Sequence, residues 1–314
     1  MTLPLGRMKK GRPLGDVPLS RVAETLQTMD DWPLPPTIPA ASAAFRQRAR
    51  GEVRARFERA GERRSEAARA YETGGLRLRF PRAGEECEAV IVNTGGGMAG
   101  GDTARIDLAV GPGARAAATT QSQEKIYRCD DDPVRVETRL RVEAGGALAW
   151  TPQETLLFDN AWLERALEAE VAPDASLLLM EAVVFGRLAH GETRIAARLR
   201  DRWRVRRGGR LVFADETRLE NAGAALDRPA VGGGARAIAL ILCVAPDAEA
   251  QAPNLRAALD TVAESEGERL EAGASAFDGL LVARLASPSP ARLRAALIGA
   301  MFALRGLRAP RVWS

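Results

Sequence analysis

The clearest folding signal in the chain is RWRVRRGGRLVFADETRLE, residues 202–220. Apolar and polar side chains alternate along both halves of this stretch, as they do in a strand with one buried face. The central Gly208-Gly209 pair supplies the positive φ angles that a type I′ turn requires. The stretch therefore predicts a β-hairpin. The residues of its apolar face are Trp203, Val205, Leu211, Phe213 and Leu219.

Similar alternation recurs from about Phe45 to Val244. In AYETGGLRLRF, residues 70–80, the glycines after Thr73 predict a second hairpin, with one strand ending near Glu72 and the next containing Leu76. A long series of short strands separated by turn residues is typical of a mainly β domain. The other predicted strands are 87–93, 103–110, 114–120, 134–142, 146–151, 164–171, 176–185, 194–200 and 236–244.

Two stretches with helical spacing follow the strands. Residues 254–266 predict a helix with Asn254 as its N-cap, and residues 290–305 predict one capped by Ser289. The apolar stripe of the second helix is Leu293, Ala296, Leu297, Ala300, Met301 and Leu304. Ile298 and Phe302 lie off this stripe. A helix that is apolar on more than one side is either deeply buried or covered by a partner, so these two residues are candidate partner contacts.

The beginning of the chain has a different composition. Residues 1–44 contain seven prolines, which resist both helix and central strand because proline lacks the donor N–H. We therefore expect a flexible N-terminal extension over 1–44 and a single β-rich domain over 45–314.

The composition excludes several classes of protein. With 314 residues, 46% hydrophobic and 27% charged, the chain is expected to fold as a soluble globular protein. Its first residues lack the apolar region of a signal peptide, and no run of eighteen apolar residues occurs, so we expect a cytoplasmic protein that does not span a membrane. Three dispersed cysteines form neither a disulfide framework nor a CxxC metal site, and His190 is the only histidine.

Charge is unevenly distributed along the sequence. Residues 45–82 contain twelve arginines and five glutamates, whereas residues 241–278 contain eight acidic residues and two arginines. Arginine runs usually cover solvated strand faces. A basic nucleic-acid-binding module remains an alternative, but no aromatic residues interleave with the basic run to stack on bases. We therefore expect no nucleic-acid partner.

The glycines at 95, 97 and 100 spell GxGxxG after an apolar strand, which on paper is a dinucleotide-binding fingerprint. That fingerprint needs a helix after it, because the helix N-terminus holds the pyrophosphate. Here the alternation of residues 103–110 predicts a strand instead, so a Rossmann-type enzyme is only the second hypothesis. The chain also lacks GxxxxGK[ST], so any hydrolysis of a nucleoside triphosphate is expected in a partner.

Several acidic residues lie beside glycines or apolar strands rather than in solvated runs. Carboxylates of this kind either bind a divalent metal weakly or accept hydrogen bonds from backbone amides. His190, in GRLAHGE, is expected to cap a turn rather than to bind metal. The acidic residues are Asp102, Glu124, Glu154, Asp159, Glu181 and Glu192.

Seven blocks of this sequence, taken in order, resemble the urease accessory protein family UreD, also called UreH. The similarity spans about 48–313, and each block alone is loose whereas the ordered set is specific. The blocks are NTGGGMAGGD (93–102), TTQSQEKIYR (119–128), WTPQETLLFDNA (150–161), EAVVFGRLAHGE (181–192), DRWRVRRGGRLVFADETRLE (201–220), FDGLLVARL (277–285) and LRGLRAPRVW (304–313).

The resemblance implies a mainly β, multi-stranded stacked-sheet domain of β-helix-like type with two helices in its C-terminal half. It further implies a non-catalytic urease maturation factor that binds apo-urease and UreF, with UreG recruited through UreF. Nickel is then a transient cargo, no cofactor is bound tightly, and GTP acts through the partner. In a passage of this kind scattered carboxylates suit weak, transient nickel binding, and the candidate residues are Asp102, Glu154, Asp159 and Glu181.

Overall fold

The computed structural model describes residues 48–81, 84–305 and 310–313. The chain separates into two units, Met1–Arg46 and Gln47–Ser314, and all described residues belong to the second. The extension predicted over 1–44 lies outside the described residues. Within the described part, no helix is long and apolar enough to cross a membrane.

The domain consists of two stacked β-sheets. The seven-stranded sheet has the order β14-β13-β11-β8-β5-β1-β2, and the ten-stranded sheet has the order β16-β17-β15-β12-β9-β6-β4-β3 with β10 and β7 beside β12. Strands of the first sheet are β1 (Arg50–Ala60), β2 (Arg64–Thr73), β5 (Thr103–Val110), β8 (Val134–Val142), β11 (Trp162–Val171), β13 (Arg198–Arg207) and β14 (Arg210–Leu219). Strands of the second are β3 (Leu76–Arg79), β4 (Cys87–Asn93), β6 (Arg115–Thr120), β7 (Glu124–Ile126), β9 (Ala147–Trp150), β10 (Thr155–Leu157), β12 (Ser176–Phe185), β15 (Ala237–Val244), β16 (Glu271–Phe277) and β17 (Leu280–Ser287).

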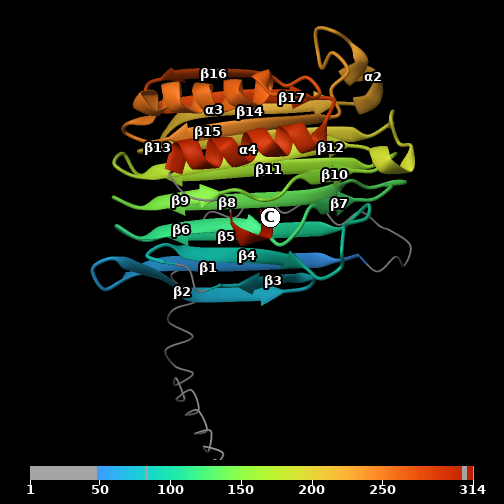
Figure 1. Ribbon diagram of the computed structural model, residues 1–314. Helices are drawn as coiled ribbons and strands as arrows, with labels where there is room; N and C mark the ends of the chain where they lie inside the picture. The colour runs from blue at the N-terminus through green and yellow to red at the C-terminus, as the bar shows by residue number, and fades with distance from the viewer. Residues whose placement is uncertain (1–47, 82–83, 306–309, 314) are drawn as a thin grey trace, which may run out of the picture. The chain divides into compact units, whose positions relative to one another are not determined.

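Between β4 and β13 the chain alternates between the two sheets, and each strand pairs in parallel with the equivalent strand of the next coil. Figure 1 shows this order as a steady change of colour through the stack. The predicted β-helix-like stacked-sheet architecture is therefore confirmed. A strand, β5, follows the glycine block, so the helix that a dinucleotide fingerprint requires is not there.

Helices α3 (Ala252–Glu264) and α4 (Pro290–Arg305) cover the outer face of the ten-stranded sheet, and the short α2 (Ala222–Asp227) follows β14. Within residues 48–81, 84–305 and 310–313, three 3₁₀ turns occur, at Leu188–His190, Ala248–Gln251 and Arg311–Trp313. Helix α4 has the predicted bounds, and Ser289 Oγ accepts from Arg292 N as expected of an N-cap. Helix α3 begins before Asn254, at Ala252, so the predicted N-cap is wrong.

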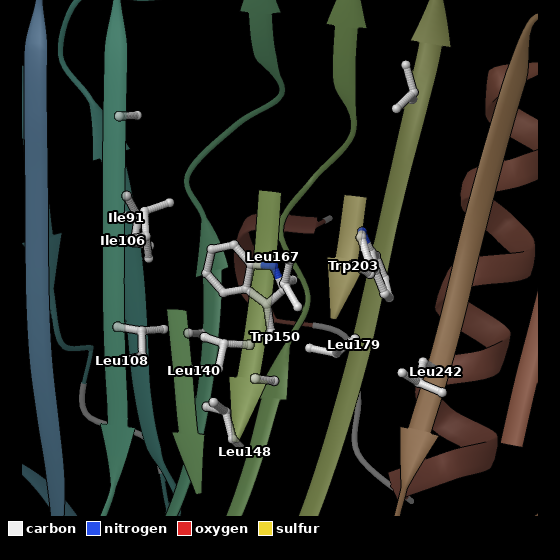
Figure 2. Close-up of a cluster of buried hydrophobic side chains, with 14 of the residues drawn as sticks. Ile91, Ile106, Leu108, Leu140, Leu148, Trp150, Leu167, Leu179, Trp203 and Leu242 are labelled. Carbon is white, nitrogen blue, oxygen red and sulfur yellow. The ribbon is translucent and has the colours of Figure 1, made fainter. Parts of the chain in front are cut away.

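Two hydrophobic clusters stabilise these layers. The larger lies between the sheets, and Figure 2 shows its central side chains, with Trp150 and Trp203 among leucines and isoleucines. The smaller lies between the ten-stranded sheet and helices α3 and α4. The alternation read from the sequence is the alternation of inward and outward positions along each strand.

One predicted hairpin is confirmed and the other is wrong. Strands β13 and β14 pair antiparallel around Gly208 and Gly209, whose φ angles are 56° and 78°. Strands β2 and β3 do not pair: β2 pairs with β1 in one sheet, and β3 with β4 in the other. The turn at Gly74 is thus a corner at which the chain changes sheet.

Candidate functional site

A charged residue, Arg165, points into the apolar space between the sheets. It lies on β11 with Leu163 and Leu167 on either side of it at the same inward parity, and both leucines are fully buried. Burying a guanidinium is costly unless carboxylates and hydrogen bonds compensate it.

Three groups compensate the charge of Arg165. Asp201, its register partner on β13, accepts from Nε at 3.1 Å and also from Nη2. Nη1 donates to Thr155 Oγ1 at 3.3 Å. Nη2 lies 3.1 Å from Oε2 of Glu181, which comes from β12 in the opposite sheet. Burial alone would lower the pKa of Arg165, but the carboxylates of Asp201 and Glu181 outweigh it and raise that pKa.

Glu181 is held from a second side by an indole. Trp150 Nε1 donates to its Oε1 at 2.7 Å, and the side chain is buried on all sides. Its Oε2 makes no hydrogen bond of good geometry to a described residue, despite the nearby Arg165. Burial raises the pKa of Glu181, against the attraction of Arg165. This Oε2 oxygen is held by the ion pair with Arg165 rather than by a hydrogen bond.

Arg165, Asp201 and Glu181 line a cavity of about 440 Å³ between the two sheets. Asp215 on β14 and Arg284 on β17 also line it, and their side chains form an ion pair that joins the sheets. This cavity, called the chamber below, is lined by carboxylates from both sheets, Glu181 from one and Asp201 and Asp215 from the other, and it reaches the exposed residues 271–273 of β16.

A further carboxylate, Glu124, continues the polar interior toward the glycine block. Glu124 is the register partner of Thr155, and it accepts from Asn93 Nδ2 at 2.9 Å. Burial raises its pKa to about 7, and the hydrogen bond from Asn93 only partly opposes this. Near neutral pH this group thus exchanges between a neutral and a charged form.

The four predicted metal residues do not come together. Only Glu181 of these four lines the chamber. Asp102 accepts from Ala49 N and Ala99 N, both at 2.8 Å, at the turn before β5. Asp159 is exposed and accepts from Ala196 N at 2.8 Å.

Glu154 is buried on the other side of the ten-stranded sheet. Arg294 of α4 donates to both of its carboxylate oxygens through Nη1, at 3.0 and 2.7 Å. The same guanidinium donates to the carbonyl oxygen of Trp313 and lies 4.7 Å from the centre of its ring. Glu154 therefore anchors α4 and residues 310–313 to the sheet.

No group of three or more potential metal ligands occurs among the described residues. His190 is exposed in the 3₁₀ turn, with its N–H bonded to the Arg187 carbonyl.

The two candidate partner contacts on α4 are both exposed. Phe302 is 63% and Ile298 is 36% exposed, one helical turn apart, whereas Leu293, Ala296 and Leu297 are buried against the sheet. Both side chains face solvent, but two apolar residues make a smaller surface than the contiguous apolar patches that mark interaction sites.

Sequence reasoning missed the residues that form most of the chamber. Arg165, Asp201, Asp215 and Arg284 were not among the candidates. Their signal is parity: Arg165, Asp201 and Asp215 take positions that alternation assigns to the inward face of their strands, whereas Arg284 is exposed. A charged residue at such a position is informative because it is rarely buried without a partner.

Comparison with known proteins identifies the family. The sequence model of the UreD urease accessory protein family matches residues 49–314. A urease accessory protein UreD of Methylobacterium sp. (strain 4-46) is 49% identical over 227 residues, covering 72% of this chain and 80% of that protein. Urease accessory protein UreD 3 of Methylorubrum extorquens (strain PA1) is 47% identical over 287 residues, covering 90% and 95%. The chain belongs to the UreD family of urease accessory proteins.

Proposed function

We propose that this chain is a non-catalytic scaffold that binds apo-urease and UreF, recruits UreG through UreF, and shelters nickel on its way to the urease active site. Its role in urease maturation follows from its family. The observation that supports the nickel step is the cavity of about 440 Å³ that Glu181, Asp201 and Asp215 line from two sheets, although these three carboxylates do not form a group of metal ligands.

The chemistry of the chamber suits transient binding of a divalent cation. Carboxylate, hydroxyl and amide oxygens are weak ligands for nickel compared with thiolate and imidazole. Arg165 already donates hydrogen bonds to Asp201 and forms an ion pair with Glu181. An arriving cation therefore competes with this guanidinium for the two carboxylates. Competition lowers affinity, and a low affinity allows release as well as entry.

The polar interior extends beyond the chamber along the register of the strands. Glu124, Thr155 and Arg165 follow one another through register pairing and a hydrogen bond. With a pKa of about 7, Glu124 gains negative charge when a proton leaves. We infer that the cargo passes along this row of inward polar groups.

Nickel binding by Asp102, Glu154 and Asp159 stays a prediction. Asp102 directs both carboxylate oxygens to backbone amides, and Glu154 directs both to Arg294. Asp159 is placed at the surface, where a cation arriving from solvent would meet it. Variants of these residues belong in the same assay as variants of the chamber.

The exposed pair Ile298 and Phe302 is proposed as a contact for a protein partner, UreF or urease. Apolar aromatic side chains contribute strongly to interfaces when they are fully covered. Phe302 makes this contribution only in a complex, since most of its surface faces solvent in the chain alone.

The test is urease maturation in cells that express the urease operon with one altered residue in this chain. Glu181→Gln keeps the shape of the side chain and leaves Arg165 paired with Asp201, so we expect a folded protein that is recovered with urease. Urease matured at limiting nickel should then contain several-fold less nickel. Glu192→Gln is the matched control, because it changes another glutamate that pairs with an arginine, and neither residue of that pair lines the chamber. Normal nickel content with Glu181→Gln would contradict the passage, and loss of the complex would make its role structural.

A further inference from the structure

One outer strand of the two sheets lacks the charges that protect the others. The seven-stranded sheet ends at β2 and β14, and the ten-stranded sheet ends at β3 and β16. An outer strand exposes unpaired backbone groups, and proteins usually blunt it with charged side chains or shortness. Strands β2 and β14 each carry four charged residues, and β3 is four residues long with two arginines. Strand β16, EAGASAF, has only Glu271 at its start.

The turn after β16 determines which backbone groups face outward. Asp278 and Gly279, with φ angles of 51° and 74°, form a two-residue turn closed by the pair Phe277 and Leu280. The closing residues of such a turn bond to each other, and alternate residues of an antiparallel strand point to opposite sides. The N–H and C=O groups of Ala272, Ala274 and Ala276 therefore point away from β17. Among the described strands, β16 pairs only with β17.

An arginine covers the centre of this edge. Arg256 of α3 donates to the Ala274 carbonyl oxygen from Nη2 at 3.0 Å and from Nε at 3.3 Å. The side chain is exposed, so its displacement disturbs no buried packing. The contact confirms that the Ala274 carbonyl points outward, and it shows that the edge accepts a cationic donor.

The surroundings of the edge are strongly acidic. Residues 260–278 contain six acidic side chains and a single arginine, Arg269. The acidic residues are Asp260, Glu264, Glu266, Glu268, Glu271 and Asp278, and all six are exposed. Phe277 at the end of the strand is 48% exposed and offers an apolar contact. A second copy of this chain would bring like charges together, whereas a basic segment would be attracted.

We propose that β16 is a docking edge for an extended, lysine- or arginine-bearing segment of a protein partner, which adds to the ten-stranded sheet as a further strand. The backbone of the segment bonds to Ala272, Ala274 and Ala276, and one of its N–H groups replaces Arg256 at the Ala274 carbonyl. Main-chain pairing gives such a contact its affinity, and the acidic rim selects the charge of the segment. This proposal does not depend on the passage of nickel.

The test measures binding of a fluorescent ten-residue peptide of alternating lysine, valine and threonine to the full chain by anisotropy. We expect Ala274→Pro to weaken binding at least several-fold, because proline removes the central outward N–H and leaves the β17 ladder intact. If Ala274→Pro folds poorly, Ala272→Pro, at an exposed position, should weaken peptide binding in the same way. The same peptide with alternate N-methylated amides should not bind, and neither should an acidic peptide of equal length.

Arg256 supplies an independent arm of the experiment. Arg256→Ala frees the Ala274 carbonyl and should tighten binding of the basic peptide. Arg292→Ala removes the same charge from the acidic rim, where Arg292 bonds Ser265 and Glu266, and should tighten it less. Equal binding by wild type and both proline variants, or by the N-methylated peptide, would overturn strand addition. Dimerisation of Arg256→Ala that Ala274→Pro abolishes would make a second copy the occupant, and the proposed basic segment would then be wrong.

Discussion

Glu124 is partly buried and accepts a hydrogen bond from the Asn93 amide, and this environment sets how its charge changes with pH. Its pKa in the folded chain is about 7, above the ordinary value of 4.5. Between these values the folded state holds a proton that the unfolded state has released, so stability falls as pH rises from about 4.5 to 7. Integrated over that interval, the loss is on the order of 3 kcal/mol at most.

We expect Glu124→Gln to remove this loss, since the amide oxygen still accepts from Asn93 and carries no charge. The variant should be more stable than wild type by about 1–3 kcal/mol at pH 8 and nearly equal to it at pH 5. Urea unfolding at several pH values measures both. Glu192→Gln is a control for which the change of stability with pH should have the opposite sign, because the hydrogen bond from Arg187 lowers the pKa of Glu192. A constant difference between wild type and Glu124→Gln from pH 5 to 8 would refute the assignment.

Substitution of Gly97 should have a measurable effect on stability. A Cβ atom there would lie 2.5 Å from the ring of Tyr127, which packs edge-on against Phe158 and donates to the Gly96 carbonyl. Gly97→Val should displace that ring, lower the free energy of unfolding by about 1–3 kcal/mol and reduce the yield of folded protein.

Tyr127→Leu in the same background separates steric conflict from backbone strain. If the ring is the obstacle, the valine costs less in the double variant than in the single one. Equal costs would show that the backbone at Gly97, not Tyr127, resists the side chain.

At the scale of elements, α4 combines a buried stripe with an exposed aromatic residue. Leu297 is buried against the sheet, and full burial of such a side chain contributes roughly 1.5–3 kcal/mol. Leu297→Asp should therefore unfold or strongly destabilise the chain. Phe302→Asp should leave thermal stability nearly unchanged and weaken recovery of the complex with partners. Equal loss of stability in both variants would exclude Phe302 as a contact surface.

Local pattern predicted the elements better than their connections. Helix α4 and the β13–β14 hairpin follow from caps, stripe and turn residues that lie within a few positions of one another. The glycines after Thr73 predicted a turn correctly, but a turn does not specify whether the next strand returns to the same sheet. Strands β2 and β3 lie in different sheets. Apolar side chains of both, including Leu76 and Leu78 of β3, face the core between the two sheets.

Local sequence pattern also predicts functional residues incompletely, as the chamber shows. Glu181 was among the candidates because it stands in an apolar strand, but Arg165 and Asp201 acquire meaning only when β11, β12 and β13 are placed around one space. Asp102 shows the reverse: its position after five glycines suggested a metal ligand or a cap, and in the fold both oxygens accept backbone N–H groups. Pairing across sheets is long-range information that local alternation does not contain.

At the scale of the whole molecule, the pure chain should release neither phosphate from GTP nor ammonia from urea. The sequence lacks a phosphate-binding loop and has a single histidine, which is exposed in a 3₁₀ turn. Phosphate release and ammonia release by the purified full chain, with and without added nickel, measure this. Turnover that is specific for one nucleotide would contradict a purely accessory role.

The stack of coils also has a mechanical consequence. Along each sheet a strand bonds to its immediate neighbours, and β12 also pairs with β10, so the stack can open strand by strand, each pairing being one link. Opening begins at a free end, because a terminal strand loses one set of neighbours and a central strand loses two. Arg165 and its partners sit several links from the β2–β3 end and are protected until those links have parted. A partner clamped on the opposite end would leave the β2–β3 end as the place where the molecule begins to unravel.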